Sequence, residues 1–171
     1  MEILALPVES WREYRDLRLR ALQEDPEAFS SSFGNAIHEP DDFWQGRLRD
    51  ALQGERSWLL FAREGAKLAG MIGAFVREDA PETAIIVSVY VPKEARGRGA
   101  AGQLMQAMLE VLSKTGRFQR ARLGVNVTQE AALRLYLKFG FKEIGRTPST
   151  TGNGRVVEQI EMERPLATEP D

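Results

Sequence analysis

Residues 89–109, VYVPKEARGRGAAGQLMQAML, change abruptly from a β-branched apolar run to arginine and glycine, and then to a helical pattern. Gly97 and Gly99 lack Cβ atoms, so the backbone N–H groups around them can wrap closely round an anion. The start of a helix adds unpaired N–H groups and about half a unit of positive charge. Arg96 and Arg98 add cations with bidentate geometry. This strand–turn–helix unit predicts a phosphate-binding turn, and its chemistry suits a pyrophosphate.

Composition limits the function classes that are open to the chain. Its 171 residues, of which 43% are apolar and 28% charged, suit one domain with one sizeable core. A net charge of −2 argues against binding of nucleic acid through a broad basic surface. The absence of cysteine excludes disulfides, thiolate catalysis and Cys-ligated zinc. With His38 as the single histidine, we expect no Ser-His-Asp relay and no metal site.

The N-terminal residues show no signal-peptide pattern, because charged residues are scattered through the first twenty positions. The longest apolar stretch, AIIVSVYV (84–91), is too short to cross a bilayer. We therefore expect a cytoplasmic protein with no membrane partner.

Hydrophobic periodicity and turn residues predict a single domain over residues 1–166 and a frayed tail over 167–171. The order is β-α-α-β-β-β-α-β-α-β-β, which gives an α/β fold with a mixed sheet and helices on both faces. The expected elements are a strand at 2–8, helices at 10–26 and 40–52, strands at 57–64, 67–78 and 83–91, a helix at 99–113, a strand at 120–127, a helix at 128–140, and strands at 141–146 and 155–164.

Some local signals refine these boundaries. Ser10 with Glu13 three residues later has the pattern of a capping box, and Thr128 stands as the N-cap of a later helix. Residues 147–154, TPSTTGNG, predict a mobile loop between the last two strands.

Two known phosphate-binding patterns compete for the glycine turn. A Walker A loop ends in Gly-Lys-Ser/Thr, but here the corresponding residues are Gly102-Gln103-Leu104, which excludes it. Gly97, Gly99 and Gly102 match G-x-G-x-x-G literally. However, the next strand ends without an acidic residue, and only one crossover unit is present, so a dinucleotide-binding fold is disfavoured.

The same turn also reads Arg-x-x-Gly-x-Ala, formed by Arg96, Gly99 and Ala101. It resembles the phosphate-binding motif of the GNAT superfamily of acetyl-CoA-dependent N-acetyltransferases. Residues 123–146, LGVNVTQEAALRLYLKFGFKEIGR, are similar to a second signature of that family, and the element order matches over about residues 2–164. The resemblance implies a GNAT-like fold with a central six- to seven-stranded mixed sheet, acetyl-CoA as co-substrate and no metal.

By this resemblance, the strands at 83–91 and 120–127 start parallel and then splay apart around the thioester. Backbone groups of the first strand bond to the pantetheine arm, and N–H groups of residues 96–101 hold the pyrophosphate. Many members carry Asn where this chain has Gln129, so either Gln129 or Asn126 is expected to contact the cofactor. The full set of expected cofactor contacts is Val89, Tyr90, Val91, Arg96, Gly97, Arg98, Gly99, Ala100, Ala101, Asn126 and Gln129.

The resemblance assigns the catalytic acid to Tyr136, which would protonate the departing thiolate of coenzyme A. A phenol of pKa about 10 can donate to a sulfur that becomes anionic. The general base stays unassigned, because the place where members often have a glutamate reads TAIIV (83–87). Glu82, Glu39, Tyr90 and a water chain remain as candidates.

The acceptor pocket of this fold is formed by the first two helices, their joining loop and the last hairpin. Phe29, Phe33 and Glu39 in that loop suit a small amphipathic amine. A polyamine, an amino acid, an antibiotic and a protein N-terminus all remain open as acceptors, and family likeness leaves a homodimer open beside a monomer. We expect direct acetyl transfer from acetyl-CoA to a primary amine; the alternative is a non-catalytic acyl-CoA-binding sensor module.

Overall fold

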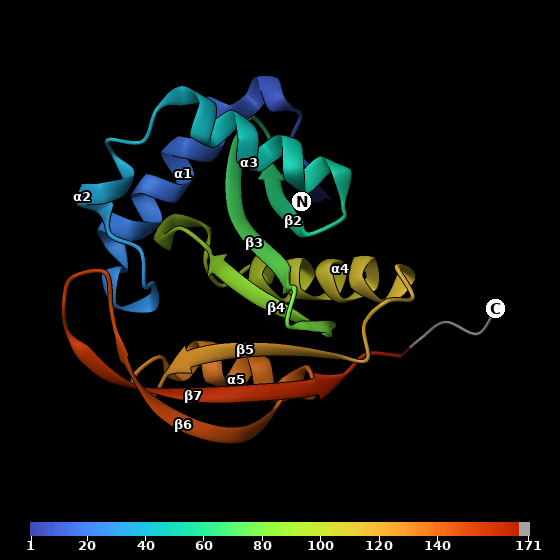
Figure 1. Ribbon diagram of the computed structural model, residues 1–171. Coiled ribbons are helices and arrows are strands. Elements are labelled where there is room, and N and C mark those ends of the chain that lie inside the picture. Colours follow the sequence, from blue (N-terminus) through green and yellow to red (C-terminus); the bar gives the residue numbers. More distant parts are fainter. Residues whose placement is uncertain (168–171) are drawn as a thin grey trace.

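The computed structural model describes residues 1–167 and forms one mixed sheet with helices on both faces (Figure 1). Of the tail expected to fray, only Ala167 lies within the described residues. The strands are β1 (Glu2–Leu4), β2 (Ser57–Glu64), β3 (Lys67–Arg77), β4 (Ala80–Tyr90), β5 (Arg120–Asn126), β6 (Lys142–Thr150) and β7 (Val156–Pro165). The helices are α1 (Trp11–Glu24), α2 (Phe33–Ala36), α3 (Asp41–Gln53), α4 (Ala100–Lys114) and α5 (Glu130–Lys138).

The seven strands lie in the order β1-β2-β3-β4-β5-β7-β6. The β4–β5 pair is parallel and is joined through α4, whereas the other neighbours are antiparallel. A parallel pair needs a long crossover connection, which the helix after the glycine turn provides. The expected mixed sheet is thus confirmed.

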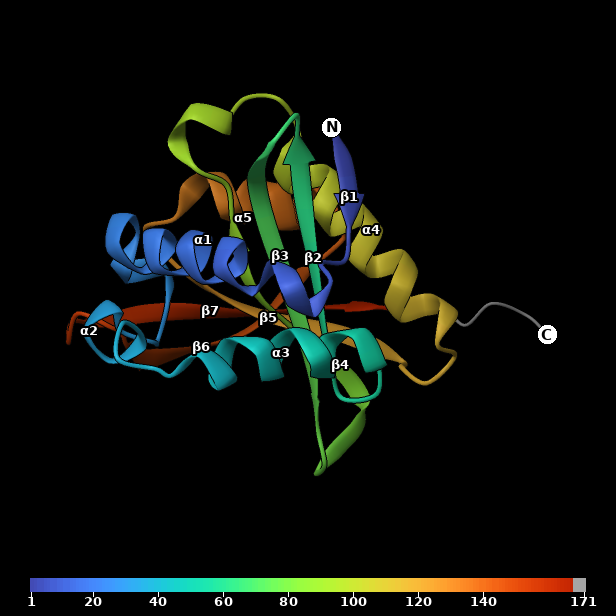
Figure 2. The same ribbon diagram turned by 90° about the horizontal axis from the view of Figure 1, so that it is seen from above.

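Helices α1 and α3 cover one face of the sheet, and α4 and α5 cover the other (Figure 2). The apolar side chains divide in the same way. Tyr14, Trp44 and Phe61 meet edge to face in the core under α1 and α3. Leu104, Met105 and Met108 of α4 are buried in the core on the opposite face. The sheet is therefore packed on both sides, which holds its central strands rigidly.

Strands β4 and β5 diverge shortly after they pair. Their register runs only from Thr83 opposite Arg120 to Ile85 opposite Arg122. Beyond that point the two strands move apart, as Figure 1 shows toward their C-terminal ends. Strand β5 instead stays paired with β7 along its whole length. The sheet consequently opens between two of its own central strands.

A β-bulge in β4 lies at this opening. Met71 of β3 pairs with Tyr90, and Gly73 pairs with Val87, so two residues of β4 face one of β3. The first of these two, Ser88, has a φ of 58° and is the only non-glycine with positive φ among residues 1–167. Strained backbone of this kind costs about 1–3 kcal/mol and concentrates at functional sites.

Several local expectations differ from the structure. Ser10 makes no side-chain capping bond because it ends a short 3-10 turn, Val8–Ser10, and Glu13 instead pairs with Arg63. The first strand stops at Leu4 rather than at residue 8. Thr128 donates its hydroxyl to Asn126, so it does not cap α5.

The loop predicted at 147–154 is wrong for its first four residues. Residues 147–150 belong to β6, with Thr150 opposite Val156 of β7. Only residues 151–155 form the turn, and Thr151 in it is buried. Within residues 1–167, no helix is both long and apolar enough to span a membrane.

Candidate active site

The glycine turn presents a row of free backbone donors at the start of α4. Within residues 1–167, the N–H groups of residues 97–102 donate to no protein acceptor. Gly97 and Gly99 have φ values of 79° and 82°, a conformation that other residues adopt only with strain. The N–H of Arg96 is already bonded to the carbonyl of Lys93, 3.3 Å away. The free donors therefore begin one residue later than the sequence suggested.

The two arginines of this turn have different partners. Arg96 Nε donates to the carbonyl oxygen of Val91 at 3.0 Å, which ties the turn to the end of β4. Arg98 Nη1 lies 2.7 Å from Glu64 Oε2 in an exposed ion pair. Such exposed pairs are weak, about 0–1 kcal/mol, so Arg98 can exchange this partner for a phosphate.

The neighbouring residues of β4 alternate across the sheet. Val89 and Val91 are partly buried and pack toward the core under α4 and α5. Tyr90 points to the opposite core, where its hydroxyl donates to Glu24 Oε2 at 2.6 Å. Burial and this bond raise the pKa of Tyr90. A phenol held in its protonated form is a poor general base, and Tyr90 is buried in the core under α1 and α3.

Tyr136 of α5 is 7% exposed and packs edge to face on Phe141. Burial alone raises the pKa of Tyr136 to about 12. Trp44 Nε1 is the only fully buried unpaired side-chain donor or acceptor in the described part of the chain, so the Tyr136 oxygen keeps some exposed surface. Tyr136 therefore holds its proton across the physiological range and can present it to a ligand.

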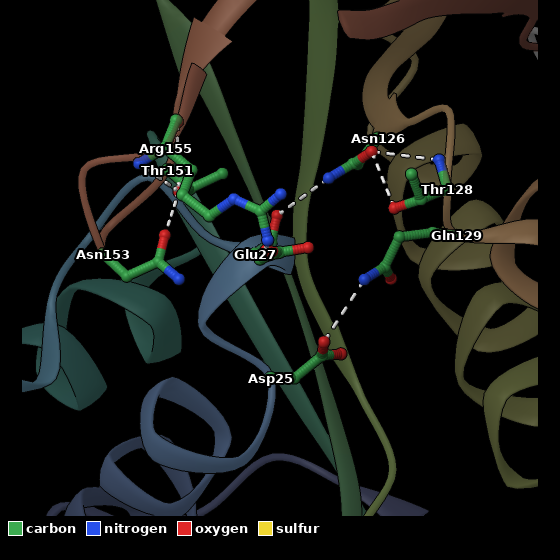
Figure 3. Close-up of polar contacts among 8 residues, drawn as sticks. All are labelled: Asp25, Glu27, Asn126, Thr128, Gln129, Thr151, Asn153 and Arg155. Atoms are coloured by element: carbon green, nitrogen blue, oxygen red, sulfur yellow. Dashed lines mark hydrogen bonds and ion pairs between the residues drawn. The ribbon is translucent and has the colours of Figure 1, made fainter. Parts of the chain in front are cut away.

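Asn126 and Gln129 lie where β5 leads into α5 (Figure 3). Asn126 Oδ1 accepts from the backbone N–H and the hydroxyl of Thr128, at 3.0 and 2.9 Å. Gln129 Nε2 donates to Asp25 Oδ1 at 3.2 Å. These contacts hold the start of α5 against the segment that follows α1, and they occupy most of the bonding capacity of Asn126.

The tip of the β6–β7 hairpin lies on the other side of that same segment (Figure 3). Arg155 pairs with Glu27, and Gly152 N donates to the carbonyl of Phe29 at 2.8 Å. A Cβ at Gly152 would come within 2.0 Å of the backbone oxygen of Ser31. Only glycine allows this approach, and no local sequence signal indicates it.

A cavity of about 340 Å³ lies between α1, α2, α3 and this hairpin tip. Of the predicted acceptor residues, Glu39 lines it. Phe29 and Phe33 belong to the adjacent core, where the Phe29 ring lies 4.7 Å below the guanidinium carbon of Arg18. The complete lining is Arg18, Leu22, Ser30, Ser31, Ser32, Asn35, Ala36, Glu39, Phe43, Trp44, Arg47, Thr151, Gly152 and Gly154.

The two carboxylates that remain as candidates for the general base, Glu82 and Glu39, lie in different parts of the molecule. Glu82 belongs to the end of β4 that is still paired with β5, where it contacts Arg120 at 3.4 Å. Glu39 is exposed at the cavity. Neither carboxylate forms a hydrogen bond with Ser88 among the described residues. Within residues 1–167, no three acidic or histidine side chains gather as a metal site would require.

Comparison with known proteins agrees with this geometry. The model of the acetyltransferase (GNAT) family matches residues 11–141. The chain belongs to the GNAT acetyltransferase family. It is an acyltransferase, and its GNAT fold is a seven-stranded mixed sheet with helices on both faces.

One curated protein and two solved structures are similar to this chain over most of its length. The L-amino acid N-acetyltransferase AaaT of Escherichia coli (strain K12) is 27% identical over 155 residues, which cover 89% of this chain and 93% of that protein. A GNAT acetyltransferase from Streptococcus pneumoniae has a TM-score of 0.83 at 20% identity, covering 96% of this chain and 99% of its own. The putative acetyltransferase YncA of Salmonella typhimurium, solved with acetyl-CoA, has a TM-score of 0.81 at 15% identity, covering 99% and 96%.

Proposed function

We propose that this GNAT protein transfers an acetyl group from acetyl-CoA directly to the primary amine of a small molecule. The observation that carries the proposal is the row of free N–H groups at residues 97–102, placed at the end of a strand that has just separated from its neighbour. In this proposal the N–H groups bind the pyrophosphate, and the pantetheine arm runs along the end of β4 that is not paired with β5. Arg98 is free to add a phosphate contact by leaving its exposed partner Glu64.

Backbone groups of β4 position the thioester in this proposal. The Val91 carbonyl already accepts a hydrogen bond from Arg96. The backbone group of Val91 that we expect to contact the pantetheine is therefore its N–H. The N–H of Val89, the second residue of the bulge, polarises the thioester carbonyl and stabilises the oxyanion as the amine attacks. Bringing the neutral amine beside the thioester supplies much of the acceleration. The chain has no cysteine to carry an acetyl group, which favours direct transfer.

Tyr136 completes the reaction. As the tetrahedral intermediate collapses, the bond from carbon to sulfur breaks and the sulfur takes the electron pair. The Tyr136 hydroxyl donates its proton to that thiolate. Because burial raises the pKa of Tyr136, the phenol still carries its proton when the thiolate forms. The amine loses its proton to solvent water, and solvent water returns a proton to the Tyr136 phenolate, so that the next cycle begins with a protonated phenol.

The relative AaaT is named for L-amino acids, which makes amino acids the first acceptors to test. The decisive experiment measures thiol release from acetyl-CoA with a panel of amines, and mass spectrometry then locates the acetyl group on nitrogen. Calorimetry with acetyl-CoA precedes it. Thiol release that requires an amine is the expected result. Tight binding of acetyl-CoA without release on any amine would contradict the proposal and indicate a sensor module.

A further inference from the structure

Arg18 is a buried cation without an anionic partner. It lies on α1, is 8% exposed and stacks over the ring of Phe29. Its Nη1 donates to Ser88 Oγ at 3.2 Å, and within residues 1–167 no carboxylate forms an ion pair with it. Burial, and then the charge of Arg47, lower the pKa of Arg18. A buried charge without a counter-ion is strongly unfavourable, so this position is suited to an anion that arrives from outside.

The surroundings of Arg18 contain more donors than acceptors. Arg47 of α3 lines the same cavity, and its guanidinium lies over Phe43 without an ion-pair partner among the described residues. Trp44 also lines the cavity and has a buried indole N–H with no acceptor. Glu39 is the single carboxylate in the lining. Two cations in one small cavity repel a polyamine and attract a carboxylate.

The contact between Arg18 and Ser88 places the guanidinium beside the residue that precedes Val89. Ser88 begins the β4 bulge and directly precedes Val89, to which the thioester carbonyl is assigned above. A carboxylate paired with Arg18 would lie about 2.8 Å from its nitrogens. The amine must reach the thioester from there, so few bonds can separate it from the carboxylate. An α-amino acid meets this condition, because one carbon carries both groups.

On the basis of the proposed function, we infer that the acceptor is an α-amino acid whose carboxylate is bound by Arg18 and Arg47. The cavity of about 340 Å³ holds the side chain of a single amino acid next to Phe43 and Trp44. The arginines thereby select the acceptor by its carboxylate, and the bulge sets the amine at the thioester.

Matched acceptors test this inference. Phenylalanine, leucine and methionine are each compared with the amine that lacks only the carboxylate, by kcat/KM for thiol release. The wild type should prefer at least one amino acid over its amine by roughly 30-fold. Arg18→Gln and Arg47→Gln should each reduce that preference to within about threefold, mainly through KM for the amino acid. Arg15→Gln, on the same helix but outside the cavity lining, should keep it.

A binding measurement makes the test independent of turnover. With CoA present, calorimetry compares N-acetylphenylalanine with N-acetylphenethylamine, which differ only in the carboxylate. Arg18→Gln should lose affinity for the first alone, while its acetyl-CoA affinity shows that it is folded. Equal acetylation of amines and amino acids would overturn the inference and leave acetyl transfer standing. If no acceptor reacts, the proposed function itself fails. In the calorimetry, equal affinity of the wild type for the two acetylated ligands would overturn the inference.

Discussion

Arg96 Nε lies 3.0 Å from the carbonyl oxygen of Val91, so the first arginine of the glycine turn fastens the end of β4 to the entry of α4. The turn is thereby held in register with the strand that is expected to carry the pantetheine. The other guanidinium nitrogens of Arg96 form no hydrogen bond or ion pair with the protein within residues 1–167. One side chain can therefore shape the turn and also contact a phosphate.

Replacing Arg96 by alanine together with Gly99 by glutamate should weaken acetyl-CoA binding at least about tenfold, or roughly 1.4 kcal/mol. The first change releases the turn from Val91. The second adds negative charge at the pyrophosphate and forces a larger residue to adopt a φ of 82°. Calorimetry measures the affinity, and Arg56→Ala, which removes an exposed pair with Glu78, is the control. Unchanged affinity in the double variant would show that phosphates bind elsewhere.

Tyr136→Phe should lower kcat by about 10²-fold or more, because the departing thiolate then lacks a positioned acid. Acetyl-CoA affinity should stay within about threefold. Thermal stability at neutral pH should change little, since burial alone perturbs the hydroxyl and no protein partner is lost. Thiol release and calorimetry on the two proteins separate these effects. If the variant has the kcat of the wild type, Tyr136 is not the acid that protonates the thiolate.

The same tyrosine predicts a loss of stability in alkali. Its pKa is about 12 in the folded chain, whereas an unperturbed tyrosine in the unfolded chain has a pKa of about 10, so below pH 10 both states keep the proton. As pH rises from 10 toward 12, only the unfolded chain ionises, and the free energy of unfolding falls. At pH 11 this loss is on the order of 1 kcal/mol.

Urea unfolding at pH 9 and pH 11 measures this loss in the wild type and in Tyr136→Phe. The variant should lose less stability than the wild type between the two pH values, by on the order of 1 kcal/mol. Tyr14 and Tyr90, whose pKa values are also raised, are common to both proteins and cancel in the comparison. Equal losses would mean that Tyr136 ionises as freely in the folded chain as in the unfolded one.

The order of elements and the glycine turn were predictable from sequence because each depends on local signals. The run from Val89 to Leu109 contains a strand, two glycines with obligatory positive φ, and a helical stripe. Predictions from local sequence signals were wrong where contacts between distant residues determine the structure. Ser10 has the residues of a capping box, yet a 3-10 turn before it and the pairing of Glu13 with Arg63 prevent that box.

The acceptor cavity could be predicted only in part. The segment that contains Glu39 was identified from its place in the fold, but Arg18 and Arg47 read as ordinary polar positions on two helices. Arg18 lies between buried Leu17 and partly buried Leu19, and nothing in that spacing shows that its guanidinium turns inward to Ser88. Contacts across 70 residues leave no trace in a single sequence.

Asn126→Ala and Gln129→Ala should have separable effects. Asn126 is buried and accepts two bonds from Thr128, so its loss should lower the free energy of unfolding by about 1–3 kcal/mol. Gln129 uses its amide nitrogen on Asp25 and keeps its oxygen for a ligand, so Gln129→Ala should weaken acetyl-CoA binding several-fold at a smaller cost in stability. Urea titration and calorimetry test both. If Gln129→Ala binds acetyl-CoA as tightly as the wild type, Gln129 does not contact the cofactor and serves only to bond Asp25.

Gly152→Ala should impair the acceptor side of the site and spare the cofactor side. An added Cβ would lie 2.0 Å from the backbone oxygen of Ser31, so the hairpin tip must move away from the loop that it contacts. Overpacking of this kind costs about 1–3 kcal/mol. Because Gly152 also lines the cavity, KM for the amine should rise while acetyl-CoA affinity stays unchanged.

Gly145→Ala is the matched control for this change. Gly145 lies on β6 of the same hairpin, and a Cβ there would meet nothing within 4 Å. Its kinetics should equal those of the wild type. Steady-state rates at varied amine and saturating acetyl-CoA distinguish the two variants. If Gly152→Ala leaves KM for the amine unchanged, or if it weakens acetyl-CoA binding to the same degree, the hairpin tip does not shape the acceptor cavity.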